Sequence, residues 1–365
     1  MRKGNYIRQS LAVSGLLLMV LFLMPLAVIV PARSPLFSQE LPMDETEPVP
    51  LTDGTQDTTF RLNILQDGKV ESMDLRTYLE GVVRAEMPAS FESETLKAQA
   101  VAARTYTLYQ LRQGKKHGDA ADLCTDPGCC QAFLAEEQAR KNWGEQAEAY
   151  AEKVSEAVRA TDGQAVLYEG EPILAVFHSS SSGQTRTAGN VWTNDLPYLQ
   201  AVSSPEDGDR IPNYYSRVEI SAEDFSAAIK GRWPEADLSG KPESWLTQAV
   251  RDSGGSVETV QVGGQTVRGT ELRGALGFRS ACFEWEVQDG VLVFFVTGHG
   301  HGVGMSQYGA NRMAEDGATY REILTHYYTG VTVEAFALQE GRNCGKISKT
   351  MRISISCRKK GSCSG

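Results

Sequence analysis

Histidines are scarce in this sequence, and two of the five lie in one loop. His299 and His301 belong to GHGHGVGMSQYGA, residues 298–310, which also holds five glycines. Two residues apart in an extended loop, their side chains point to the same side. A metal site needs a third ligand, and no H-E-x-x-H pattern supplies one. We therefore expect the two histidines to line a polar cleft, where glycine lets a bulky ligand approach the backbone.

One carboxylate stands on an apolar helix face. Glu86 follows Val82 by four residues and Val83 by three, so it lies on the apolar stripe of a helix predicted to start after Asp74 and end before Pro88. Burial raises the pKa of a carboxyl group and keeps it protonated, which suits a general acid. The alternative is a buried glutamate that forms a salt bridge with a basic side chain.

Two cations follow on the next predicted helix, residues 90–111, whose middle is rich in alanine. Ser90 or Ser93 can cap this helix. Lys97 and Arg104 are seven residues apart and therefore share one helix face. A short turn joins the helix to Glu86, so the two cations can orient that carboxyl group or bind a polyol or anionic ligand. The alternative is a structural ion pair with Glu86 or a neighbour.

A polar loop, FHSSSSGQT at residues 177–185, contains His178 and four serines. Its hydroxyl groups suit the binding of sugar hydroxyls. A serine nucleophile activated by histidine is the alternative, but the G-x-S-x-G elbow of such enzymes is missing here.

A separate loop, HGDAADLCTDPGCC at residues 117–130, is rich in soft metal ligands. Several such ligands within fourteen residues indicate a small structural zinc site. Outside the membrane, a disulfide is the natural alternative. Cys282 lies in an apolar strand and is expected to be a buried thiol. The expected zinc ligands are His117, Cys124, Cys129 and Cys130.

Helical and strand patterns alternate without a regular βαβ rhythm, which predicts an α+β fold. We expect a single mixed domain with an inserted smaller lobe, preceded by one transmembrane helix. A hairpin is predicted around Asp67-Gly68. Further predicted elements are one or two helices in residues 135–160, two strands in 163–185, a helix over 304–328 and a strand near 331–337.

The N-terminal region resembles a membrane anchor. Residues 11–30 carry no charge and match the thickness of a bilayer as a helix. Basic residues before this segment favour a cytoplasmic N-terminus. A cleaved signal peptide is the alternative, although the apolar run is long and no A-x-A site follows. The expected organisation is a cytoplasmic N-terminus 1–10, an anchor 11–30, a linker 31–58, a catalytic domain 59–338 and a basic disordered tail 339–365.

The net charge of −10 argues against nucleic-acid binding by a broad basic surface. The last twenty residues, in contrast, carry six basic residues and no acid. This tail lacks hydrophobic periodicity, so we expect it to be disordered; it is either a solvated tail or attracted to an anionic surface. Its cysteines have no assignment.

Several stretches together resemble one family, the stage II sporulation protein D family, which also includes amidase enhancers. The resemblance runs from about residue 60 to 335 and rests mainly on the E-M-P turn and the G-H-G-x-G-M-S-Q-Y-G-A loop, in this order. The stretches that carry it are YLEGVVRAEMPASFESETLKAQAVAARTY (78–106), HSSSSGQT (178–185), VWTNDLPYLQAVSSPED (191–207), GTELRGALGFRS (269–280) and GHGHGVGMSQYGANRMAEDGATYREILTHYYTGV (298–331).

The resemblance implies a lytic transglycosylase that cleaves peptide-stripped peptidoglycan strands between N-acetylmuramic acid and N-acetylglucosamine and leaves 1,6-anhydro ends. Such an enzyme needs one carboxylate, and Glu86 matches the catalytic acid of the family. No cofactor is implied for catalysis, whereas the Cys/His loop matches a structural zinc loop of some members. The implied substrate-binding residues are Lys97, Arg104, His178, Ser181, Gln184, Tyr198, His299, His301 and Gln307.

The resemblance also implies a place and partners. The catalytic domain is expected outside the mother-cell membrane, facing the forespore, where it would act in engulfment with an amidase (stage II sporulation protein P) and a membrane scaffold (stage II sporulation protein M). Cys129 stands where the family pattern leads us to expect histidine, and Gln200 where we expect lysine. Two rival functions remain: a non-catalytic glycan-binding enhancer of an amidase, and a metallohydrolase that uses His299 and His301.

Overall fold

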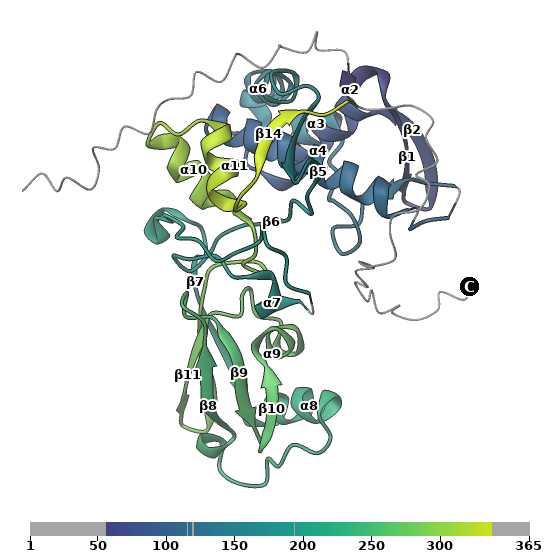
Figure 1. The fold of residues 1–365 in the computed structure, drawn as a ribbon. Helices are drawn as coiled ribbons and strands as arrows, with labels where there is room; N and C mark the ends of the chain where they lie inside the picture. Colours follow the sequence, from purple (N-terminus) through teal and green to yellow (C-terminus); the bar gives the residue numbers. More distant parts are fainter. Residues whose placement is uncertain (1–55, 115, 119, 193, 338–365) are drawn as a thin grey trace, which may run out of the picture. The chain divides into compact units, whose positions relative to one another are not determined.

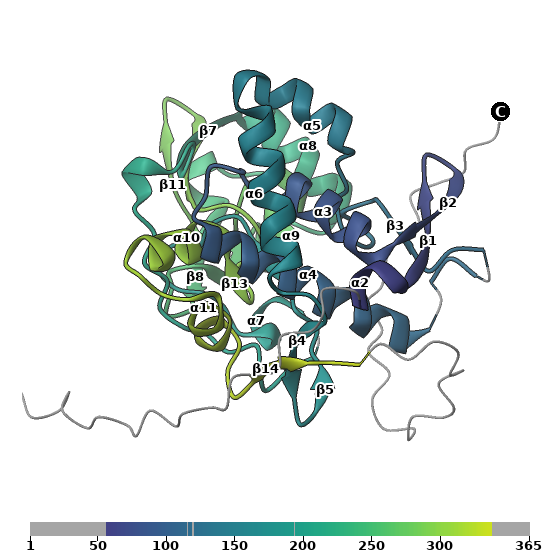
Figure 2. The same ribbon diagram turned by 90° about the horizontal axis from the view of Figure 1, so that it is seen from above.

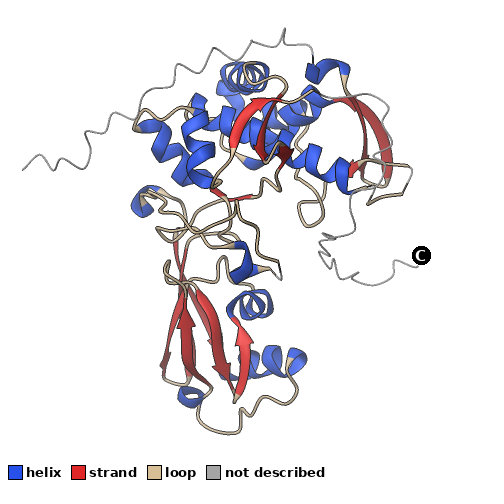
Figure 3. Ribbon diagram, in the orientation of Figure 1, coloured by secondary structure: helices blue, strands red, loops and turns tan. Residues whose placement is uncertain are grey.

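The computed structural model describes residues 56–114, 116–118, 120–192 and 194–337. Helices and strands are mixed, as expected for an α+β fold (Figure 3). The expected transmembrane segment, the cytoplasmic N-terminus and the basic tail lie outside the described residues. Within the described part, no helix combines the length and the apolar character that crossing a membrane requires.

The domain opens with a hairpin of β1 (Arg61–Gln66) and β2 (Lys69–Asp74), which are antiparallel. The predicted turn at Asp67-Gly68 is present, and both residues have positive φ values, 48° and 77°. Such a turn matches the twist of a hairpin. The short strand β3 (Leu123–Cys124) runs parallel to β1 and thereby attaches the cysteine loop to the hairpin.

Helix α3 (Leu75–Glu86) follows the hairpin directly. Its predicted N-cap is confirmed, because the Asp74 carboxylate accepts a hydrogen bond from the backbone N–H of Thr77. Its C-cap, Met87, is extended at φ −126°, as expected before a proline. The helix therefore places Glu86 on its last turn.

Helix α4 (Ser93–Gln113) is the central helix of the first hydrophobic cluster. It contacts α3, α6 (Ala147–Arg159) and β4 (Gln164–Tyr168), because its alanines let other elements approach closely (Figures 1 and 2). Its N-cap is Glu92, which makes no side-chain capping bond, so neither predicted serine caps the helix.

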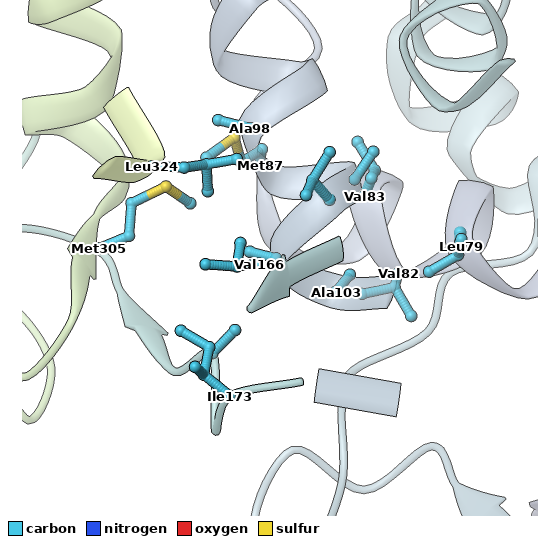
Figure 4. Packing of buried hydrophobic residues seen from close by; sticks show 14 of the residues in the cluster. Leu79, Val82, Val83, Met87, Ala98, Ala103, Val166, Ile173, Met305 and Leu324 are labelled. Carbon is cyan, nitrogen blue, oxygen red and sulfur yellow. The ribbon is translucent and has the colours of Figure 1, made fainter. Parts of the chain in front are cut away.

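Around α4 the first cluster is completed by helices and by a three-stranded sheet of order β14-β4-β5. Figure 4 shows Val83 from α3, Ala98 and Ala103 from α4, and Val166 from β4 within this cluster. The remaining elements here are α5 (Glu136–Trp143), the 3₁₀ turn η2 (Gly144–Gln146), β5 (Glu171–Pro172) and β14 (Thr332–Ala335).

A second hydrophobic cluster is built by a continuous segment, and its buried members run from Phe225 to Val296. Chain segments on both sides of it belong to the first cluster, so this part of the chain is an insertion, as predicted. Two three-stranded sheets form it, of orders β10-β9-β8 and β11-β12-β7. Its elements are β7 (Tyr215–Ser221), α8 (Ala222–Arg232), η4 (Pro242–Ser244), β8 (Leu246–Arg251), β9 (Val257–Val262), β10 (Gln265–Arg268), α9 (Gly269–Leu276), β11 (Phe283–Gln288) and β12 (Val291–Thr297).

After the insertion, β13 (Met305–Ser306) pairs in parallel with β6 (Phe177–His178). The single helix predicted over residues 304–328 is wrong, because two helices occupy this range. Gly317 has a φ of +97°, and Thr319 then starts the second helix with a capping box. The elements are α10 (Gln307–Glu315) and α11 (Tyr320–Tyr327); the short helices α7 (Ala188–Val191) and η3 (Gly208–Arg210) lie earlier in the chain.

The predicted linker ends earlier than residue 58. Gln56–Thr59 form the short helix α2, and Asp57 within it is buried. The backbone N–H of Asp57 donates to the Asp162 carboxylate at 2.9 Å, and its own carboxylate pairs with buried Arg104. The proline- and acid-rich composition predicts a linker up to residue 58, but this long-range ion pair makes the last residues of the predicted linker part of the fold.

Candidate active site

Glu86 lies at the C-terminal end of α3 and is half-buried. Its carboxylate accepts one hydrogen bond, from the backbone N–H of Ala132 at 3.2 Å. Burial raises the pKa of Glu86, and the Ala132 donor offsets part of that rise. Among the described residues no cation forms an ion pair with Glu86. The side chain is therefore a carboxyl group biased toward its protonated form, as a general acid requires.

The segment that supplies this donor is docked along α3. The N–H of Leu134 donates to the Gly81 carbonyl at 3.0 Å, and Arg84 donates to the Leu134 carbonyl at 3.1 Å. A Cβ at Gly81 would come within 2.1 Å of the Phe133 ring, so only glycine lets this segment lie so close. The position of the Ala132 N–H, and with it the Glu86 carboxylate, depends on this packing.

The cysteine loop that precedes Ala132 gathers the four predicted zinc ligands. His117 Nε2 lies 3.8 Å from Cys129 Sγ and 3.6 Å from Cys130 Sγ, and the two sulfurs are 3.9 Å apart. All four ligand atoms, including that of Cys124, lie within 4.8 Å of one another. A tetrahedral zinc site with ordinary bond lengths needs about 3.8 Å between sulfurs and about 3.5 Å between sulfur and nitrogen. The donor set therefore fits zinc.

The disulfide alternative does not match this arrangement. Within the part of the chain that the structure describes, Cys124, Cys129, Cys130 and Cys282 form no disulfide, and the 3.9 Å between the Cys129 and Cys130 sulfurs is far longer than an S–S bond. Cys282 is half-buried and directly precedes β11, so the expected buried thiol within a strand is only partly confirmed.

The glycine-rich histidine loop packs against the serine-rich loop. The backbones of Ser180 and His299 exchange two hydrogen bonds, at 3.0 and 2.9 Å. A Cβ at Gly300 would lie 2.6 Å from the His178 Cβ, and φ there is +122°, so glycine is required for this approach. The glycine-rich histidine loop is thus hydrogen-bonded to the serine-rich loop.

The three histidines of these loops are neutral near pH 7. Burial lowers the pKa of His178 and His299, and burial together with Arg273 lowers that of His301 to about 4. His178 Nδ1 faces the Val303 carbonyl at 3.2 Å and therefore carries its proton, which leaves Nε2 to accept from Ser181 Oγ at 2.8 Å. His299 Nδ1 accepts from Arg279 at 3.0 Å.

A cleft opens beside the turn that follows Glu86. It has a volume of about 250 Å³, and Phe91 and Tyr308 meet edge to face in its wall at 5.0 Å between ring centroids. Tyr308 belongs to the glycine-rich loop motif, so two motifs that are distant in the sequence share this cleft. The lining residues are Ser90, Phe91, Asp207, Arg210, Ile211, Tyr308, Asn311, Arg312 and Glu315.

The sequence was compared with known proteins. A family model described as stage II sporulation protein matches residues 66–168. Stage II sporulation protein D of Bacillus amyloliquefaciens is 37% identical over 265 residues, which is 72% of this chain and 75% of that protein. The chain belongs to the stage II sporulation protein D family. The Bacillus subtilis member is 36% identical over 265 residues, with the same coverage of both chains.

A second kind of relative is more distant. The amidase enhancer of Bacillus subtilis is 27% identical over 308 residues, which covers 71% of this chain but only 40% of that longer protein. Within the stage II sporulation protein D family, the matched region includes α3, α4 and the cysteine loop.

For Arg104 the predicted substrate contact is wrong. Its side chain is 0% exposed and donates to both oxygens of the Asp57 carboxylate, while its other nitrogens donate to the carbonyls of Gln164 and Val158. Lys97 pairs with Glu94 at 2.6 Å instead of Glu86. The structural alternative is therefore correct for Arg104, whereas Lys97 pairs with a neighbour and stays partly exposed.

Four other predicted contact residues use their polar atoms within the fold. The Tyr198 hydroxyl accepts from the Leu174 N–H at 3.3 Å, and buried Gln307 donates to Gln99 at 3.4 Å. Ser181 and His178 are buried and satisfy each other. These four residues support the shape of the loops. Gln184, His299 and His301 are only half-buried.

Metal binding by the histidine loop finds no support among the described residues, where the candidate metal cluster is the cysteine loop. His301 instead lies between aromatic rings, 5.5 Å from His178 and 5.3 Å from Trp192 between centroids.

Sequence reasoning missed Glu206. Its Oε1 accepts from the Ser181 N–H at 2.8 Å, from Ser204 Oγ at 2.9 Å and from Ser306 Oγ at 2.6 Å. It therefore joins the serine-rich loop to the start of α10. The available signal was one of two adjacent acids in the S-S-P-E-D stretch, and no spacing reveals its partners.

Proposed function

We propose that this protein is a membrane-anchored lytic transglycosylase of peptide-stripped peptidoglycan strands, and that Glu86 is its catalytic residue. The observation that carries the proposal is the half-buried carboxyl group of Glu86, with its raised pKa, on the last turn of α3. It stands in the family-matched region, and the turn that follows it leads to Ser90 and Phe91 in the wall of the 250 Å³ cleft.

One carboxylate is sufficient for this reaction. Glu86 donates its proton to the glycosidic oxygen as the bond from that oxygen to the anomeric carbon of N-acetylmuramic acid breaks. The 6-hydroxyl of the same sugar then forms a bond to the anomeric carbon, and its proton passes to the Glu86 carboxylate. The products are a 1,6-anhydro end and a free N-acetylglucosamine end, and no water is consumed. Hydrolytic glycosidases, by contrast, ordinarily require a second carboxylate.

The cysteine loop would support this chemistry without taking part in it. His117, Cys124, Cys129 and Cys130 would hold a structural zinc ion, which crosslinks the loop when bound. The loop continues into Ala132, whose N–H meets the Glu86 carboxylate. A well-ordered loop therefore keeps that carboxylate in place.

The family relationship supports a proposed location and proposed partners. Residues 11–30 would anchor the chain in the mother-cell membrane, with the catalytic domain facing the forespore. There it would act during engulfment beside a sporulation amidase, which removes stem peptides, and a membrane scaffold. These partners are stage II sporulation proteins P and M.

A second candidate is a glycan-binding enhancer of an amidase. The 27% identity with an amidase enhancer favours it. The two functions differ in their dependence on Glu86, since a binding protein has no need of a protonated carboxyl group.

The test uses the chain from Pro50 onward and peptide-stripped glycan strands, with products identified by mass spectrometry. Wild type should release 1,6-anhydro products, and Glu86→Gln should bind the strands without cleaving them. Glu71→Gln, which changes an exposed carboxylate on β2, is the matched control and should cleave normally. Cleavage by Glu86→Gln at the wild-type rate would refute the catalytic assignment, whereas binding without cleavage by wild type would favour the enhancer.

A further inference from the structure

Arg186 has a buried guanidinium group that is only partly satisfied. The side chain is 3% exposed, and its Nε donates to the Asp252 carboxylate at 2.6 Å. Nη1 and Nη2 are also buried, yet neither has a hydrogen-bond partner among the residues that the structure describes. Buried polar groups in folded proteins nearly always have partners, so these two N–H groups indicate a ligand or bound water.

These nitrogens belong to a small pocket behind the histidine loop. Arg186, His301 and Ser180 line it, and the Ser180 hydroxyl is a further buried group without a partner. The free volume is about 10 Å³, which is room for one water-sized polar group and far too little for a sugar ring. A ligand would therefore insert a single small group here.

The surroundings carry positive charge. Arg273 and Arg279 lie near the same histidines, and neither forms an ion pair among the described residues. The Nε of Arg279 is likewise buried and unpartnered. Asp252 pairs with Arg186, and the neutral histidines add no charge. The small group that fits such a pocket is an anion.

The fold holds Arg186 in place for such a ligand. Its backbone N–H donates to the Gly302 carbonyl at 2.7 Å, and a Cβ at Gly302 would come within 2.9 Å of the Arg186 Cδ. Outside the pocket lining, the half-buried Trp192 ring lies 5.3 Å from the His301 ring between centroids. A pre-positioned fork beside an aromatic ring suits a carboxylate attached to a sugar.

We propose that this pocket binds the lactyl carboxylate of a muramic acid from which the stem peptide has been removed. The inference rests on the proposed function, which supplies the glycan strand. In a peptide-bearing strand this group is a neutral amide that continues into the peptide, so it lacks the charge that the arginines attract and is too large to enter. Arg186 and its neighbours thereby select stripped strands.

The experiment measures binding to two forms of a stripped muramic-acid-containing glycan oligomer, one with free carboxylates and one with methylamides in their place. All measurements use the Glu86→Gln background, which prevents cleavage. The parent should bind the carboxylate form at least about tenfold more tightly, in line with a charge-assisted hydrogen bond. Arg186→Lys, which keeps the charge beside Asp252 but removes the fork, should lose most of that preference.

Arg279→Gln provides a second variant, because this side chain is only half-buried and pairs with no carboxylate among the described residues. It should also reduce the preference. Arg217→Gln removes the same charge from an exposed position on β7 and should leave the preference unchanged. Equal binding of both oligomers by the parent, or binding of neither, would overturn the proposal.

Cleavage by the chain with Glu86 intact is measured separately. A retained carboxylate preference without any cleavage would refute the transglycosylase assignment and leave the pocket standing. Cleavage without a carboxylate preference would refute the proposed pocket and leave the transglycosylase assignment standing.

Discussion

The buried ion pair between Asp57 and Arg104 gives the sharpest prediction about the fold. Arg104 is 0% and Asp57 is 1% exposed, and the pair joins α2 to the middle of α4. Asp57→Asn removes the negative charge and leaves a guanidinium buried without its counterion. Losing one partner of a buried pair costs about 3–5 kcal/mol of the free energy of unfolding. For a domain of this size the melting temperature should fall by roughly 6–20 °C.

The assay is urea denaturation of the chain from Pro50 onward, with a thermal scan beside it. Glu71→Gln is the matched control, because it removes a carboxylate from an exposed position on β2 and should change the unfolding free energy by less than about 0.5 kcal/mol. A chain that starts at Phe60 lacks Asp57 altogether and should lose as much stability as Asp57→Asn.

A double variant separates the buried charge from simple loss of contacts. In Asp57→Leu with Arg104→Met both charges are absent, so much of the lost stability should return. The reasoning is refuted if Asp57→Asn unfolds at the same urea concentration as wild type. It is also refuted if the double variant is less stable than the sum of its two single changes, since the cost would then not arise from an unpaired charge.

Three further predictions concern the site. Burial raises the pKa of Glu86, so the folded state favours the protonated carboxyl group. The stability that this group contributes is complete below the unfolded pKa of about 4.3 and is lost as the pH rises through the higher folded value. Glu86→Gln should therefore stabilise the domain at pH 7 but not at pH 4, as compared by urea midpoints. Cys124→Ser should lower the melting temperature and reduce bound zinc, as measured by elemental analysis, well below one ion per chain. The control Cys282→Ser should retain the metal. Equal zinc in wild type and Cys124→Ser would contradict the four-ligand site. Gly304→Ala should destabilise the domain by more than about 2 kcal/mol, because φ is +70° and the new Cβ would lie 2.2 Å from the Val176 carbonyl oxygen. The control Gly274→Ala on α9 places its Cβ in open space and should be tolerated. Equal melting temperatures for the two variants would show that the loop at Gly304 adapts.

Local signals in the sequence were sufficient for a large part of the fold. The Asp67-Gly68 turn, the Asp74 cap and the end of α3 before Pro88 each depend on a few adjacent residues, and the structure confirms them. The helical period that placed Glu86 on an apolar face is equally local, and the half-buried side chain agrees with it. The four zinc ligands occur within fourteen residues, so a short loop can gather them.

Tertiary structure decided which polar side chains face a ligand and which serve the fold. The helical period placed Lys97 and Arg104 on one face of α4. It could not show that the Arg104 guanidinium pairs with the carboxylate of Asp57, 47 residues earlier. Glu206 meets Ser306 across 100 residues, and the unpartnered nitrogens of Arg186 exist only because the histidine loop closes over them. Helical and strand periods act between neighbours in the chain, whereas the partner of a buried charge is chosen by packing between distant segments. The sequence by itself therefore determined many of the elements and the candidate acid, and only the packed structure assigned the remaining charges to stability or to binding.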